Sequence, residues 1–131
     1  MKVAVDFDGT ICRKAKWPKM GKPVPGAVAW MKRIHKAGAK LILYTMRSGK
    51  PLDEAVGYLE GEGVELYSVN SCPGQHTWSS SPKVYANAYV DDAAIGCPLV
   101  KPKEGDPYVD WGEVGPLLLS MLEEGKEGAK N

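Results

Sequence analysis

The chain has 131 residues, enough for one domain with a hydrophobic core but short for two. Its formal net charge is +1, so no overall charge draws it to nucleic acid or to a membrane surface. No apolar stretch approaches the roughly 20 residues that a membrane span needs, so we expect no membrane partner.

The first predicted element is a buried strand over residues 3–5, an apolar run (Val-Ala-Val) that ends in two carboxylates, Asp6 and Asp8. Carboxylates one residue apart repel each other unless a cation or a proton lies between them. The pair suits a divalent metal such as Mg²⁺, or a nucleophile beside an acid/base group. The alternative is an ordinary turn, because Asp-Gly after a strand is a common hairpin signal.

Strand and helix patterns then alternate along the chain. Helices are predicted from about residue 25 to 37, from 51 to 59 and over a closing segment that includes 114–122, with a short helical turn at 82–87. Strands are predicted at 41–44, 64–69 and 89–90; residues 96–110 read as irregular, and residues 123–131 as a frayed tail. This alternation favours right-handed crossovers and a parallel sheet in an α/β fold.

Three of the predicted strands end in polar groups of complementary kinds. Parallel strands bring their carboxyl ends to one edge of the sheet, where ligands bind in open α/β folds. Two acidic pairs, a hydroxyl and a lysine together would surround a metal-bound phosphoryl group with donors and charges. These residues are Asp6 and Asp8, Thr45, Lys83, and Asp91 and Asp92.

This set resembles the four motifs of the haloacid dehalogenase superfamily, through Asp6-Phe7-Asp8-Gly9-Thr10, Thr45, Lys83 and Asp91-Asp92, over nearly the whole chain. The resemblance implies a Rossmann-like, three-layer α/β/α sandwich with a mostly parallel central sheet. It also implies a Mg²⁺-dependent phosphatase that works through an aspartyl-phosphate. Superfamily members that lack the second aspartate include dehalogenases and phosphonatases, so Asp8 favours a phosphate monoester as substrate.

The resemblance also implies a role for each acidic residue. Asp6 would be the nucleophile, and Asp8 the acid/base, with its main-chain carbonyl on the metal. Lys83 would neutralise the nucleophile and the phosphate. One aspartate of the Asp91-Asp92 pair would ligate the metal directly; Asp92 is preferred, and the order stays open.

The resemblance further implies that Thr45 binds a phosphoryl oxygen, and we expect Gly9, Thr10 and Arg47 to bind phosphate as well. A guanidinium just past a strand end can bind a phosphate through two parallel hydrogen bonds. Thr45-Met46-Arg47 resembles the Ser/Thr-x-Arg of several superfamily phosphatases, including the phosphatase part of phage polynucleotide kinase. The alternative is an arginine that faces solvent at the start of a helix.

Two loops are candidates for substrate contact. The segment 13–22, which we call the flap, contains five basic residues and no acidic one, and either attracts an anionic substrate or is simply solvated. The loop before Lys83 carries Trp78, which either stacks on a base or a sugar or plugs the edge of the sheet.

No cap domain fits between these motifs, so residues 1–131 read as a single domain with an open site. Water would then be excluded by the loops, by the substrate or by a second subunit of a homo-oligomer. An open site favours an exposed phosphate, such as a nucleotide or a nucleic-acid end, although the net charge does not indicate nucleic acid.

The sequence leaves one other function open, a phospho-ligand-binding module that retains the fold without significant turnover.

The three cysteines, Cys12, Cys72 and Cys97, cannot all pair, and no secretory signal precedes the first strand. We therefore expect a cytoplasmic protein.

Overall fold

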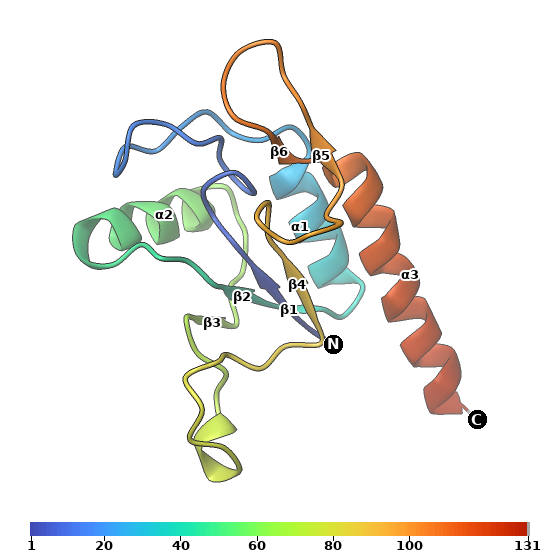
Figure 1. Ribbon diagram of the computed structural model, residues 1–131. Coiled ribbons are helices and arrows are strands. Elements are labelled where there is room, and N and C mark those ends of the chain that lie inside the picture. Colours follow the sequence, from blue (N-terminus) through green and yellow to red (C-terminus); the bar gives the residue numbers. More distant parts are fainter. Residues whose placement is uncertain (131) are drawn as a thin grey trace.

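The computed structural model describes residues 1–130, and the side chains of residues 1–125. A four-stranded parallel sheet lies at its centre (Figure 1), in the order β3-β2-β1-β4. The strands are β1 (Lys2–Val5), β2 (Lys40–Leu43), β3 (Ser68–Val69) and β4 (Ala88–Val90). Val5 of β1 pairs with Leu43 on one side and with Val90 on the other, so these three strands end level with one another.

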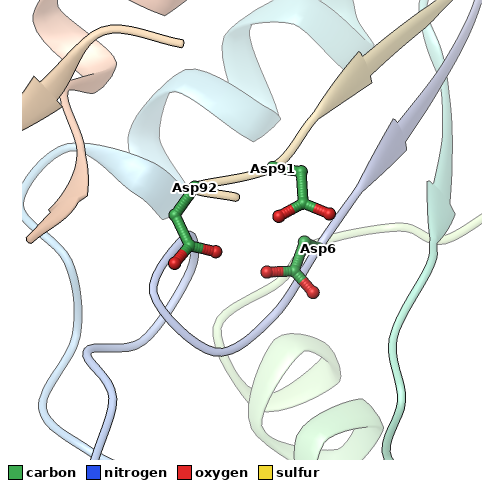
Figure 2. Close-up of side chains that lie close together, drawn as sticks. All are labelled: Asp6, Asp91 and Asp92. Atoms are coloured by element: carbon green, nitrogen blue, oxygen red, sulfur yellow. The ribbon is translucent and has the colours of Figure 1, made fainter. Parts of the chain in front are cut away.

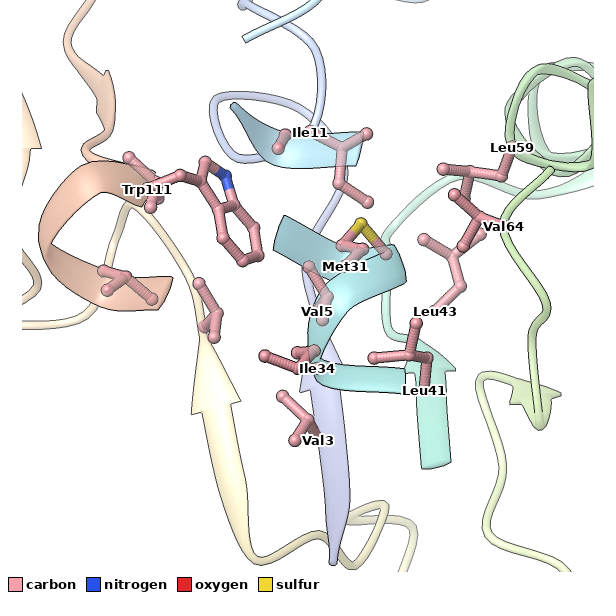
Figure 3. Packing of buried hydrophobic residues seen from close by; sticks show 14 of the residues in the cluster. Val3, Val5, Ile11, Met31, Ile34, Leu41, Leu43, Leu59, Val64 and Trp111 are labelled. Atoms are coloured by element: carbon pink, nitrogen blue, oxygen red, sulfur yellow. The ribbon is translucent and has the colours of Figure 1, made fainter. Parts of the chain in front are cut away.

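One face of the sheet carries the main hydrophobic core. Alternate residues of the strands point to this face, because side chains alternate across a strand. Figure 3 shows Val3 and Val5 of β1 against Met31 and Ile34 of α1 (Ala27–Lys36). The same core includes Leu59 of α2 (Gly49–Gly61) and Trp111 of α3 (Trp111–Lys130). All three helices therefore contribute to one face, and they hold the strand ends in place.

The opposite face is covered by irregular chain. Ala4 and Ile42 form a smaller buried cluster with Cys72, Val84 and Ala86, all of which come from the segment between β3 and β4. Within the described residues, the only helical piece of this segment is the short 3₁₀ turn η1 (Gln75–Thr77). The α/β class and the mostly parallel sheet are thus confirmed, with this outer layer made of loop.

The predicted helical turn at 82–87 is wrong. Val84 and Ala86 are buried while Tyr85 between them is exposed, which is the alternation of an extended chain rather than a helix. The hydroxyl of Tyr89 donates to the carbonyl of Val84 and accepts from the backbone N–H of Ala86, and these bonds hold the segment along the sheet.

Several predicted boundaries also change. Strand β3 contains only Ser68–Val69, because Val64 instead closes the end of α2 by donating its N–H to Leu59. The region 96–110 includes a two-stranded antiparallel sheet, β5 (Leu99–Val100) and β6 (Tyr108–Val109). Helix α1 begins at Ala27, α2 is longer than predicted, and α3 continues through the expected frayed tail to Lys130. Asn131 lies outside the described residues.

Among the described helices, none has the length and apolar character needed to span a membrane.

Candidate active site

The site lies where three neighbouring strands end. Asp6 follows β1, Thr45 follows β2 shortly after its last residue, and Asp91 and Asp92 follow β4. The N–H of Asp6 donates to the carbonyl of Val90 at 2.9 Å, which holds the ends of β1 and β4 together. This is the edge of the sheet at which the sequence placed the acidic pairs.

Three carboxylates meet at this edge (Figure 2). Asp6, Asp91 and Asp92 each offer one oxygen, and these oxygens all lie within 4.8 Å of one another. Burial, followed by repulsion from Asp91 and the interaction with Asp92, raises the pKa of Asp6 from 3.8 to about 8. Hard oxygen ligands at this spacing, with too little positive charge around them, fit a divalent cation.

Gly9 and Thr10 position these carboxylates; both are buried and neither lines the pocket that holds Asp6, so their contact with phosphate stays a prediction. The Thr10 hydroxyl donates to Asp6 Oδ2 at 3.2 Å and accepts from the backbone N–H of Asp92 at 3.3 Å. Gly9 has a φ of +85°, and a Cβ there would lie 2.5 Å from Asp92 Oδ2. Only glycine leaves room for that carboxylate at such a φ.

The cation next to the cluster is Lys14, from the flap. Its Nζ lies 3.0 Å from Asp92 Oδ2, and the hydrogen bond to Asp92 raises the pKa of Lys14. Only 8% of the Asp92 side chain is exposed, so this ion pair is partly shielded from water. Lys14 lines the same pocket as Asp6 and Asp91.

Lys83 does not occupy the position expected of it among the carboxylates. Its Nζ lies 5.4 Å from the centre of the Tyr89 ring, and it forms no salt bridge with any residue in the described part of the chain. It lines a separate pocket with Trp78 and Tyr85. The reason is the extended course of residues 84–87, which places Lys83 before the start of β4 rather than at its end.

Arg47 contacts Asp8 instead of the open pocket. The guanidinium donates to both carboxylate oxygens, from Nη2 to Oδ1 at 2.7 Å and from Nε to Oδ2 at 2.8 Å. Its Nη1 donates to the carbonyls of Pro18 and Pro51, and only 1% of Arg47 is exposed. Both earlier readings of Arg47, a phosphate ligand and a solvent-facing residue, are therefore wrong for this structure. The Asp8 side chain consequently stays outside the group of three carboxylates.

Thr45 has the placement expected of a phosphate ligand. It lines the pocket with Asp6, and its backbone N–H donates to Asn70 Oδ1 at 2.8 Å. Its hydroxyl oxygen accepts from the N–H of Arg47 at 3.1 Å, and the hydroxyl proton has no acceptor among the residues the structure describes. That proton remains free to bind an oxygen in the pocket.

The pocket above the carboxylates has a volume of about 420 Å³. Its aromatic residue is Trp17, from the flap, and Met46 lies on the same wall. Trp78 instead packs edge-on against Tyr85 at the separate pocket that Lys83 lines, so its predicted role as a site wall is wrong. In Figure 1, η1 next to Trp78 lies at the opposite end of the sheet from the flap.

Among known proteins, a solved structure matches this chain over most of its length. No family model and no curated protein matches the chain. A solved structure of a conserved protein from Bacteroides thetaiotaomicron matches with a TM-score of 0.75 and 34% sequence identity, over 92% of this chain and 91% of that chain. The chain belongs to the same family as this Bacteroides protein.

Several residues that line the pocket were not singled out by the sequence, among them Lys14, Trp17, Met46 and Asp106. Lys14 was included in the basic flap, but no pattern singled it out from the other four basic residues. The only reason to expect Trp17 at the site was that it is an isolated aromatic residue among lysines. The reason to expect Trp78 there was stronger, because Trp78 lies close to Lys83, which matches a family motif.

Proposed function

We propose that the chain is a Mg²⁺-dependent phosphohydrolase of the haloacid dehalogenase type that cleaves a phosphate monoester through a phosphorylated Asp6. The main support is the convergence of Asp6, Asp91 and Asp92 at the ends of neighbouring parallel strands, within 4.8 Å of one another. Thr45 and Lys14 line the same pocket and supply the donor and the positive charge that a phosphoryl group needs.

The three carboxylates fit the metal that this chemistry uses. Asp6, Asp91 and Asp92 would hold the Mg²⁺, which neutralises charge on the phosphoryl oxygens when bound. With its pKa at about 8, Asp6 is mostly protonated at pH 7 when no cation is present. A protonated carboxyl is a poor nucleophile, so activity should depend on the cation that keeps Asp6 ionised.

The proposed reaction has two displacements. An oxygen of Asp6 attacks phosphorus, the bond from phosphorus to the substrate oxygen breaks, and that oxygen leaves as an alcohol after taking a proton. Water then attacks the phosphorus of the acyl phosphate, which releases inorganic phosphate and restores the Asp6 carboxylate. For Asp8 to give and take the proton, its carboxylate must release at least one of its two bonds with Arg47.

Hydrolysis of p-nitrophenyl phosphate with and without Mg²⁺ tests the proposal. We expect metal-dependent turnover that Asp6→Asn reduces to background. Asp53→Asn is the matched control, since Asp53 is exposed on α2 and takes no part in the site. Turnover that survives Asp6→Asn would exclude the covalent route.

One observation favours the second candidate, a phospho-ligand-binding module without turnover. Both oxygens of Asp8 are already bonded to the buried Arg47, so the expected acid lies in the pocket wall with both of its oxygens engaged. For such a module, calorimetry would detect Mg²⁺-dependent binding of inorganic phosphate, while no monoester would be hydrolysed.

We also infer a reducing compartment, which means the cytoplasm. Cys12, Cys72 and Cys97 are all free thiols, and the first two are buried. Thiol titration of the unfolded protein, purified without reductant, should find three free thiols.

A further inference from the structure

Two large apolar side chains lie exposed beside the carboxylates. Trp17 is 59% exposed and Met46 is 89% exposed, yet both line the pocket that holds Asp6 and Thr45. Neither belongs to the hydrophobic core. An apolar wall next to convergent polar groups is the usual composition of a small-molecule site.

The Trp17 ring is held by the same guanidinium that holds Asp8. Arg47 Cζ lies 5.4 Å from the centre of the Trp17 ring, within the range of a cation–π interaction. Arg47 Nη1 also donates to the carbonyl of Pro18, the next residue, at 3.0 Å. Because Arg47 is buried, it gives this part of the flap a fixed support, and an aromatic ring positioned in this way loses little entropy when a ligand stacks on it.

The pocket is larger than a phosphoryl group requires. Its volume of about 420 Å³ lies within the range of sites that enclose whole small molecules. With the phosphorus next to Asp6 and an oxygen on Thr45, the rest of the substrate extends toward the remaining wall. Trp17 and Met46 are the large apolar residues of that wall, which also includes Ala15, Ala93 and Asp106. The flat face of an indole is best matched by another flat ring.

We propose that Trp17 is the specificity-determining residue of the site, and that it selects phosphate monoesters whose leaving group carries a flat aromatic ring, such as a nucleoside monophosphate. This inference rests on the proposed function for its reacting end. The phosphoryl group binds among Asp6, Thr45 and Lys14, and the ring stacks on Trp17.

Steady-state kinetics on a nucleoside monophosphate and on glycerol phosphate test this inference. Trp17→Ala should raise KM for the nucleotide about tenfold, the size of a lost stacking contact, and leave KM for glycerol phosphate within about twofold. Trp17→Phe should restore most of the nucleotide affinity. Trp78→Ala is the matched control, because Trp78 is 64% exposed but lines another pocket, and it should change neither substrate.

An equal rise of KM on both substrates, or no change on either, would overturn the inference. If the wild-type chain hydrolyses no monoester, the proposed function fails. The role of Trp17 in ligand binding can then still be tested by calorimetry. With Mg²⁺ present, the nucleoside monophosphate should bind more tightly than glycerol phosphate, and Trp17→Ala should abolish the difference. Equal binding of the two ligands by the wild-type chain would contradict the role of Trp17.

Discussion

Arg47 and Asp8 are 39 residues apart in the chain and form an ion pair in which both carboxylate oxygens are bonded, at 2.7 and 2.8 Å. Arg47 also bonds the carbonyl of Pro18 in the flap and that of Pro51 in α2. A single buried guanidinium thus joins the turn after β1, the flap and the start of α2.

Replacing this guanidinium should destabilise the fold. Arg47→Met removes the guanidinium and leaves Asp8 and the carbonyls without their donors, so we expect a loss of about 3 kcal/mol in the free energy of unfolding. This is the lower end for a buried pair, because 21% of the Asp8 side chain is exposed. Urea denaturation measures this loss, with Arg33→Met on the surface of α1 as the control. Equal stabilities of the two variants would contradict the structural role.

The two lysines should differ in their effects on turnover. Lys14→Ala leaves Asp92 without its cation beside an incoming anion, and we expect kcat/KM to fall at least about tenfold. Lys83→Ala should cost less than about twofold, because Lys83 contacts Tyr89 and no carboxylate of the cluster. Kinetics with p-nitrophenyl phosphate compare them directly. A larger loss of kcat/KM in Lys83→Ala than in Lys14→Ala would support the role that the family resemblance assigns to Lys83.

The raised pKa of Asp6 predicts how metal-free stability changes with pH. Between 3.8 and about 8 the folded protein holds a proton that the unfolded chain releases, so the contribution of Asp6 to stability is lost as pH rises through this window. Mg²⁺ should therefore raise Tm more at pH 8 than at pH 5, and removal of Mg²⁺ with a chelator should reverse the gain. Asp6→Asn should flatten the pH dependence of stability in the absence of metal. If the variant kept the wild-type pH dependence, a group other than Asp6 would be its cause.

The flap lysines should act on substrate binding. Lys16 and Lys19 are exposed and form no salt bridge with any described residue, and both line a groove that shares Lys14 with the pocket that holds Asp6. Replacing both with alanine should raise KM a few-fold with little change in kcat. The effect should fade as salt approaches 1 M, where charges are screened within about 3 Å. A rise of KM that does not depend on salt would contradict this long-range attraction, and would indicate direct contact with the substrate or a changed flap conformation.

The sequence predicted the parts of the site that follow from strand ends. Asp6, Thr45 and Asp91 each come after a short apolar run, and the parallel topology puts such positions at one edge of the sheet. The helices followed from their 3.6-residue spacing in the same way, for example Met31 and Ile34 on the buried face of α1.

The rest of the site depends on contacts between segments far apart in the chain, which no local pattern encodes. Lys83 was predicted from its match to a family motif, and Trp78 from its place just before Lys83, but the extended course of residues 84–87 leaves both at another pocket. Arg47 was expected beside phosphate from its place after Thr45, yet its bonds go to Asp8 and Pro18. Trp17 lines the pocket next to Pro18, whose carbonyl accepts one of those bonds.

Detection of phosphate on Asp6 tests the central claim most directly. The full chain, mixed with Mg²⁺ and p-nitrophenyl phosphate and quenched in acid during turnover, should yield a phosphorylated peptide that contains Asp6, identified by mass spectrometry. The same peptide from Asp6→Asn should carry no phosphate, whereas Asp53→Asn should behave like the wild-type chain. Turnover with no phosphate on Asp6, or phosphate on another residue, would contradict the proposed mechanism.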